Sequence, residues 1–115
     1  MNREALKYLF DIKIYTEDIE LFMQGIENVN QFLNDKKTIA AVERCLIIIG
    51  EAVNNFRKVE QQIIIDDANK IYGLRNRLVH AYDAIEDETL YVIIKQHLPV
   101  LKKQVDLLIL SNHKS

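Results

Sequence analysis

Hydrophobic residues recur every three or four positions along most of the chain, which is the spacing of one face of an α-helix. In the first part of the sequence the pattern is carried by Ala5, Leu9, Ile12, Tyr15, Ile19, Phe22 and Ile26. It predicts one long amphipathic helix that ends at about Gly25. Residues 27–34 contain three asparagines and interrupt the pattern. We therefore expect a connection there, with Asn34 or Asp35 capping the next helix.

The next hydrophobic stretch is apolar on more than one side. One face of the predicted helix carries Ile39, Val42, Leu46, Ile49, Val53 and Phe56. Around its middle, the apolar surface is widened by Cys45, Ile47 and Ile48. A helix that is apolar nearly all round is buried on two sides. Because a chain of 115 residues has few helices to cover it, we expect a second subunit to contribute.

Two more helical segments complete the pattern. From Gln61 onward an apolar stripe consists of Ile64, Ile65, Ala68, Ile71, Leu74 and Leu78. We expect Gly73 to kink or loosen this helix. Asp87 is placed to cap a last helix, whose apolar positions are Leu90, Ile94, Leu98, Leu101, Val105 and Leu108. Pro99 lacks a backbone donor, so this helix should kink or split near residues 96–98.

These elements predict an all-α fold, an up-and-down helical bundle of four to five helices in a single domain, residues 1–115. The presence of only 3 Gly and 1 Pro agrees with long helices. The longest apolar run, residues 46–49, is far shorter than a membrane span. No signal-type segment follows the first residues. We therefore expect a cytoplasmic protein without membrane contact, in which the single cysteine, Cys45, is a core residue rather than a nucleophile.

The net charge of −2 argues against broad, non-specific binding of nucleic acid, which needs a basic surface. Any contact with RNA must therefore be local. Lys70, Arg75 and Arg77 are close in sequence to each other, and Arg57 and Lys58 end the preceding predicted helix. These basic residues form either a local patch or ordinary solvated helix faces.

Residues 74–83 combine a cation, an imidazole and a phenol at short spacing: Arg75, His80 and Tyr82. On an ideal helix Arg75 and Tyr82 lie on nearly the same side, whereas Arg75 and His80 lie roughly 140° apart. Arg75 and His80 can therefore act on one substrate only if the helix ends between them or if a second subunit contributes.

Two interpretations of these residues remain open. In the first, His80 accepts a proton from a ribose 2′-hydroxyl and Arg75 holds the phosphate, with no metal or cofactor. In the second, Arg75 is an ion-pair partner of Glu51 or Asp83, and His80 caps a helix. Glu51 is either a solvated carboxylate or a partner that hydrogen-bonds Arg75 or orients His80. The residues alone favour the second interpretation. No Cys or His pair has metal-ligand spacing.

The spacing of Arg75, His80 and Tyr82 resembles the signature of HEPN-domain ribonucleases, and the HepT-like toxins are the most similar branch. A second stretch, residues 41–52, ends in Ile-Gly-Glu-Ala and is similar to the family's second helix. The resemblance spans nearly the whole chain. It implies an all-helical homodimer in which two motifs face each other and form a composite cleft that cuts RNA. It makes Arg75 and His80 the catalytic residues, supported by Asn76 and Glu51.

The resemblance also implies a partner. HepT-like toxins are neutralised by a minimal nucleotidyltransferase antitoxin (MntA-like), which transfers AMP to the tyrosine of the motif, here Tyr82. Two other functions stay open. The chain could be a non-catalytic HEPN module that binds a nucleotidyltransferase or a nucleotide, or a purely structural dimeric bundle.

Overall fold

The computed structural model describes residues 1–80 and 85–114, with side chains as far as Asn112. The described part contains helices and no strands, which confirms the all-α prediction. The helices are α1 (Arg3–Phe22), α2 (Val29–Leu33), α3 (Lys36–Val59), α4 (Ala68–Val79), α5 (Asp87–Gln96) and α6 (Leu98–Lys114). Five of them have ten or more residues, and α2 has five.

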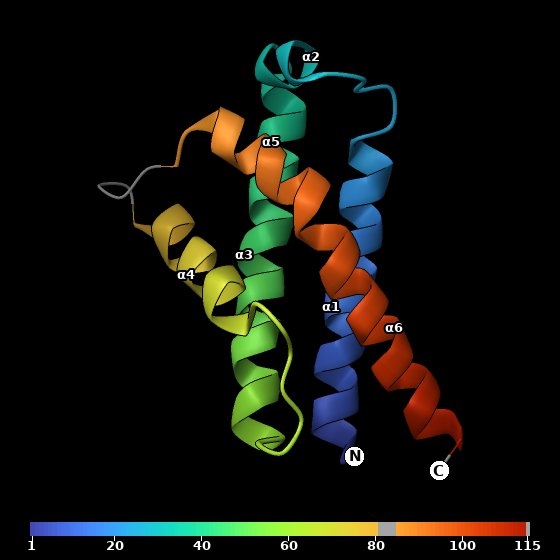
Figure 1. The fold of residues 1–115 in the computed structure, drawn as a ribbon. Helices are drawn as coiled ribbons and strands as arrows, with labels where there is room; N and C mark the ends of the chain where they lie inside the picture. Colours follow the sequence, from blue (N-terminus) through green and yellow to red (C-terminus); the bar gives the residue numbers. More distant parts are fainter. Residues whose placement is uncertain (81–84, 115) are drawn as a thin grey trace.

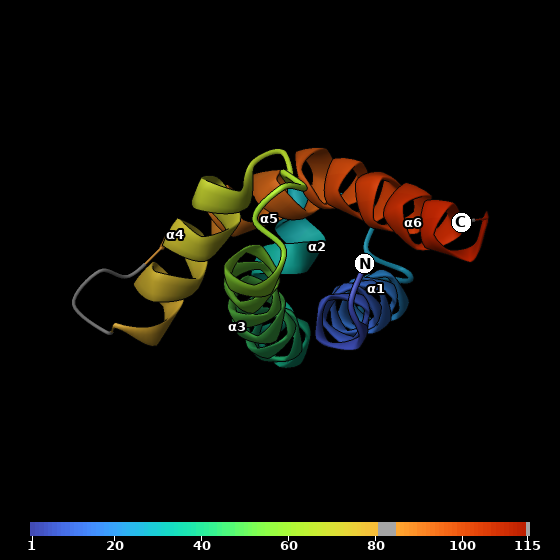
Figure 2. The ribbon, with the colours of Figure 1, turned by 90° about the horizontal axis from the view of Figure 1, so that it is seen from below.

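The long helices run up and down (Figure 1). α1 and α3 are antiparallel neighbours, α4 returns along the outer side of α3, and α5 and α6 run obliquely in front of α3 and α1, from upper left to lower right. Seen along α1 and α3, these two helices form one layer, α5 and α6 cross it on one face, and α4 flanks α3 (Figure 2). α4 therefore packs beside α3, whereas α6 lies over α1.

The beginning of α3 is fixed by a side-chain cap. Asp35 is the N-cap residue, and its carboxylate accepts hydrogen bonds from the Thr38 backbone N–H (3.1 Å) and the Thr38 hydroxyl (2.8 Å). These two bonds lower the pKa of the Asp35 carboxyl, the backbone bond having the larger effect. Of the two expected caps, Asp35 and Asn34, the structure uses Asp35.

The segment before this cap differs from the prediction. Residues 27–34 were expected to be a connection, but they contain the short helix α2. Asn28 caps it, since its side-chain oxygen accepts from the Gln31 N–H at 2.9 Å. Phe32 is fully buried, and its ring centroid lies 5.4 Å from that of Tyr91 in α5. Two of the asparagines that break the apolar pattern, Asn28 and Asn34, are thus the cap residues of a short helix. The buried Phe32 packs this helix into the core.

The prediction that helix begins at Gln61 is also wrong, because α4 starts at Ala68. The Gln104 side chain of α6 accepts from the Asp66 N–H (2.9 Å) and donates to the Ile64 carbonyl (3.0 Å). This tertiary contact holds the segment as a loop, with Ile64 78% exposed. α4 then continues through Gly73 to Val79.

The break between α5 and α6 lies where Pro99 predicts it, at His97 between Gln96 and Leu98. The start of α5 is shifted by one residue from the prediction. Glu86 is the N-cap, and the expected cap Asp87 is the first helical residue. Asp87 and Glu88 then place two carboxylates in the first turn, where they interact favourably with the helix dipole.

α3 is the central helix of the core and packs against α1, α4 and α2. Its own chain buries Cys45 and Leu46, whereas Ile47 and Ile48 stay half-buried. Burial raises the pKa of the Cys45 thiol, and the residue belongs to the core as expected. Within the described residues, each helix is too short or too polar to cross a membrane.

Candidate functional site

The contact between α3 and α4 is closest where Gly50 meets Arg75. A Cβ atom on Gly50 would collide with the Cβ of Arg75 and would lie 2.9 Å from its Cγ and 3.3 Å from the Ile71 carbonyl oxygen. A glycine is therefore needed at this position. The aliphatic part of Arg75 lies directly against the backbone of α3, which fixes where its side chain starts.

Two side chains then hold the Arg75 guanidinium. Its Nη2 lies 3.0 Å from Glu51 Oε1, and its Nη1 donates to Asn76 Oδ1 at 2.9 Å. The ion pair is 23% exposed at Arg75 and 49% exposed at Glu51, so water screens it and its contribution to stability is small. Its main effect is on the direction of the guanidinium. The structure thus brings together three of the predicted site residues.

Asn76 contacts Arg75 directly, since its side-chain oxygen accepts a hydrogen bond from the guanidinium of that preceding residue. Glu51 matches one of its two interpretations, the one in which it hydrogen-bonds Arg75. The same contact fits both open interpretations of Arg75, because an arginine held by a carboxylate can be either a structural ion pair or an oriented phosphate ligand.

His80 lies just beyond the end of α4. The helix ends at Val79, and His80 is the C-cap, with an extended backbone (φ −98°, ψ 108°) and an exposed side chain. Its backbone N–H still donates to the Asn76 carbonyl at 3.1 Å. The helix therefore ends between Arg75 and His80, which is one of the two solutions that the spacing requires. Tyr82 lies outside the described residues.

Sequence analysis missed an aromatic residue beside Arg75. The Tyr72 ring centroid lies 5.9 Å from the Arg75 Cζ and 5.2 Å from the Arg57 Cζ. Tyr72 is one of the residues that line a cavity of about 220 Å³, together with Glu51, Asn54, Asn55 and Arg75. The signal was available in the sequence. Tyr72 precedes Arg75 by three residues, and Glu51, Asn54 and Asn55 form a polar stripe at helical spacing.

The basic residues near the motif border several hollows. Arg57 joins Arg75 at the Tyr72 ring, and it lines a hollow of about 720 Å³ together with Lys70. Lys70 also lines, with Arg77, a cleft of about 290 Å³ between α4 and α5, whose other lining residues are Ile71, Gly73, Leu74, Ile93 and His97. Within the described part of the chain, no cluster of three or more His, Cys, Asp or Glu side chains could hold a metal ion.

A further hollow, of about 420 Å³, lies on the outer face of α3. It is lined by Ala40, Glu43, Arg44, Ile47, Ile48 and Glu51. Burial raises the pKa of the Glu43 carboxyl, and the negative charge of Asp87 adds to the effect. Glu51 borders both this hollow and the Tyr72 cavity. The half-buried isoleucines Ile47 and Ile48 are therefore next to the Arg75 site.

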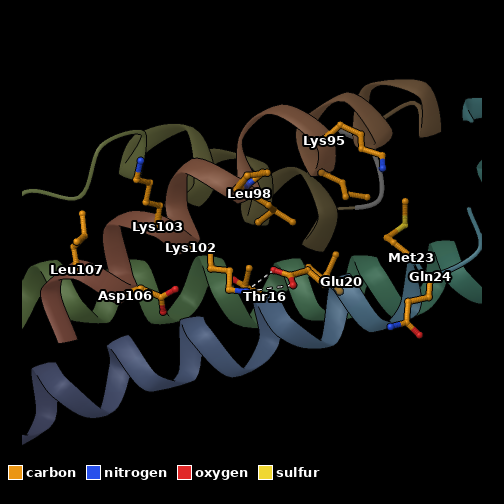
Figure 3. A pocket seen from close by; sticks show the side chains of 13 residues that line it. Thr16, Glu20, Met23, Gln24, Lys95, Leu98, Lys102, Lys103, Asp106 and Leu107 are labelled. Carbon is orange, nitrogen blue, oxygen red and sulfur yellow. Dashed lines mark hydrogen bonds and ion pairs between the residues drawn. The ribbon is translucent and has the colours of Figure 1, made fainter. Parts of the chain in front are cut away.

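A groove of about 600 Å³ lies elsewhere, where α1 meets α5 and α6 (Figure 3). Two of its charged groups are in ion pairs: Lys102 Nζ lies 2.9 Å from Glu20 Oε1, and Asp106 Oδ1 lies 3.2 Å from the Nζ of Lys13, a residue outside the lining. The hydrogen bond to Glu20 raises the pKa of Lys102. Neither a histidine nor an aromatic ring lines this groove. We therefore place the candidate site at Arg75.

Comparisons with known proteins give the class of this site. The family model described as "Ribonuclease HepT-like" matches residues 12–108. "Probable ribonuclease HepT" of Thermococcus cleftensis is 37% identical over 106 residues, which are 89% of this chain and 93% of that protein. "Putative RNase MJ1380" of Methanocaldococcus jannaschii is 34% identical over 110 residues, 92% and 97% of the two chains. "Putative RNase MJ1216" of the same organism is 32% identical over 109 residues, 94% and 89%. No solved structure matches the chain significantly.

The helical bundle with its motif at a helix end defines an all-α protein of the HEPN type. The chain belongs to the HepT-like ribonuclease family, because the family model covers most of its length. The expected membership of this family is thereby confirmed.

The approach of α4 to α3 gives a first test. We expect Gly50→Ala to destabilise the protein by roughly 1–3 kcal/mol, because its methyl group must push Arg75 away. Gly73→Ala is the matched control, since a Cβ there meets no atom within 4 Å. It should be neutral or stabilising by up to about 1 kcal/mol. Urea denaturation of both variants measures the difference, and equal stability of the two would show that α4 does not need Gly50.

Proposed function

We propose that the protein is a metal-independent endoribonuclease and the toxin of a toxin–antitoxin pair. It acts on RNA in the cytoplasm. One observation supports this most: Arg75 is oriented by Glu51 and Asn76 at the surface, just before the helix ends at the exposed His80. Membership of a ribonuclease family supports RNA as the substrate.

In the proposed reaction His80 accepts the proton of a ribose 2′-hydroxyl. The 2′ oxygen then bonds to the neighbouring phosphorus, and the bond from phosphorus to the 5′ oxygen breaks. The leaving oxygen takes a proton, and the other product carries a cyclic phosphate. Arg75 binds the phosphate and stabilises the negative charge that grows during the attack. The reaction uses no metal and no cofactor.

The active form is proposed to be a homodimer in which two motifs face one composite cleft. The half-buried Ile47 and Ile48 support this, because they present apolar surface beside Glu51. A second copy covering this face would bring its own Arg75 and His80 close to the first pair. A cleft built in this way holds two imidazoles, so one can accept a proton while the other donates one.

The Arg75–Glu51 ion pair also fits a second function. A non-catalytic HEPN module that binds a nucleotidyltransferase or a nucleotide would also need an Arg75 side chain held in one orientation. It would not need His80 to accept a proton. The two functions differ in what His80 does. An adjacent gene for a small nucleotidyltransferase would favour the toxin pair.

The first prediction of this proposal is that His80→Ala and Arg75→Ala each abolish RNA cleavage and keep the helix content. Both side chains lie outside the hydrophobic core. Gel analysis of RNA fragments and circular dichroism measure the two effects. DNA of the same sequence should stay intact because it lacks the nucleophile, and a chelator should have no effect. Cleavage of DNA, or dependence on a divalent ion, would contradict the mechanism.

For the dimer, we expect Ile48→Asp to give monomers or aggregates, because a charge would enter the subunit interface. Sedimentation measures the oligomeric state. Val100→Asp is a matched control, since Val100 is 51% exposed on α6. It should remain a dimer. If Ile48→Asp stays an active dimer like the control, the interface does not use this face of α3.

The third prediction concerns Tyr82 and the antitoxin. Co-expression with the cognate nucleotidyltransferase should add AMP to Tyr82 and abolish cleavage. The added phosphodiester would pair with Arg75 and occupy the position that the RNA phosphate must take. Intact mass and peptide mapping measure the modification. Tyr82→Phe should escape this silencing, and an unmodified Tyr82 in a neutralised complex would mean that inhibition comes from binding alone.

A further inference from the structure

Arg57 is a second arginine that the fold holds in place beside the Arg75 site. It lies in the last turn of α3, and its Nε donates to Asn54 Oδ1 at 3.2 Å. Its Nη1 donates to the Oδ1 of Asn69, in α4, at 2.6 Å. The side chain is half-buried. Contacts from two helices therefore restrict the direction of this guanidinium.

Both hydrogen-bond partners of Arg57 are neutral. None of the ion pairs in the described part of the chain includes Arg57, whereas Arg75 is paired with Glu51. Neither hydrogen bond of Arg57 uses its Nη2. Arg57 thus keeps its positive charge and a terminal nitrogen that can donate to an anion. A planar guanidinium with several donors is well matched to phosphate.

The Tyr72 ring limits the separation of the two arginines. Its centroid lies 5.2 Å from the Arg57 Cζ and 5.9 Å from the Arg75 Cζ. The two Cζ atoms are therefore no more than about 11 Å apart, the sum of these distances. The phosphates of a stacked strand follow one another about every 3.4 Å along the axis. A strand with one phosphate at Arg75 has further phosphates within this distance.

Arg57 lies between two hollows of different charge. On one side is the cavity of about 220 Å³ that Tyr72 lines, and on the other is the hollow of about 720 Å³ that Arg57 itself lines. The first has one carboxylate in its described lining, Glu51, which Arg75 neutralises. The second has three carboxylates: Glu60, Asp66 and Asp67. We therefore expect an anion to approach Arg57 from the side of Tyr72.

From these contacts we infer that Arg57 is a second phosphate-binding residue. It contacts a backbone phosphate of the RNA close to the one at Arg75, and Tyr72 keeps the two guanidinium groups near each other. The inference rests on the proposed function, because it assumes that the scissile phosphate lies at Arg75. Arg57 binds the substrate and takes no part in the chemistry. Arg57→Gln should therefore raise KM more than it lowers kcat.

The test uses full-length protein carrying His80→Ala, so that RNA is bound but not cut. The probe is a short fluorescein-labelled single-stranded RNA, and fluorescence anisotropy measures its affinity at several salt concentrations. Loss of one phosphate contact should reduce the slope of log affinity against log salt by about 0.7. Arg57→Gln should therefore weaken binding, and its deficit should be roughly two- to threefold smaller at 200 mM than at 50 mM salt.

A matched set of RNAs locates the contact. In each, one phosphate is replaced by a neutral methylphosphonate. At one linkage this replacement should weaken binding to the parent protein and have no further effect in Arg57→Gln. A different linkage should lose its effect in Arg75→Gln. Two phosphates, one for each arginine, would then be assigned.

Two further variants separate a phosphate contact from charge and folding. Arg57→Lys keeps the charge and should keep the salt slope. Lys103→Gln removes the same charge from the exposed side of α6 and should leave the slope and the sensitivity to every linkage unchanged. Circular dichroism and urea denaturation check the fold. An Arg57 that only complements the negative end of the α3 dipole would affect stability and leave RNA binding unchanged.

Several outcomes would overturn the inference. These are an unchanged slope in Arg57→Gln, the same loss of affinity in Lys103→Gln, sensitivity to every linkage that persists in Arg57→Gln, or no RNA binding by the His80→Ala protein. Failure of the proposed function gives a different result. Wild-type protein would then leave RNA uncut, while the methylphosphonate set still reports whether Arg57 binds a phosphate.

Discussion

The site depends on one steric constraint, the absence of a side chain at Gly50. Because α3 has no side chain at Gly50, α4 can approach closely enough for Arg75 to contact the α3 backbone. Only at this separation can Glu51, one residue further along α3, reach the guanidinium at 3.0 Å. Packing, rather than the ion pair, therefore determines the arrangement. The exposed ion pair contributes little energy, and a buried glycine contact fixes where it forms.

The second determinant is the point at which α4 ends. If the helix continued past Val79, His80 would be turned away from Arg75 by the helical rotation. The extended backbone at His80 frees the imidazole from that rotation. Within one subunit, Arg75 and His80 can therefore approach one substrate because α4 packs closely on α3 at Arg75 and ends before His80. A short motif can combine these two features, because the helix contact is made at Arg75 and the helix ends at His80.

Helix periodicity and capping chemistry predict much of this fold, because both are local. Pro99 marks the break between α5 and α6, and Asp35 caps α3. The errors have tertiary causes. The apolar spacing after Gln61 is helical, but Gln104, far along the chain, holds that segment as a loop. At the site, motif spacing indicated Arg75, and its contact with Glu51 was one of two open interpretations of that carboxylate. Tyr72 was missed because its neighbours come from α3 as well as α4.

α4 has a single main packing partner. It rests on α3, while a cleft separates it from α5. An element with few packing contacts can detach from a folded protein at a smaller free-energy cost than global unfolding. Detaching α4 would expose one face of α3 and leave α1, α3 and α6 packed. The protein can therefore lose the geometry around Arg75 reversibly, by a subglobal fluctuation, without losing its bundle.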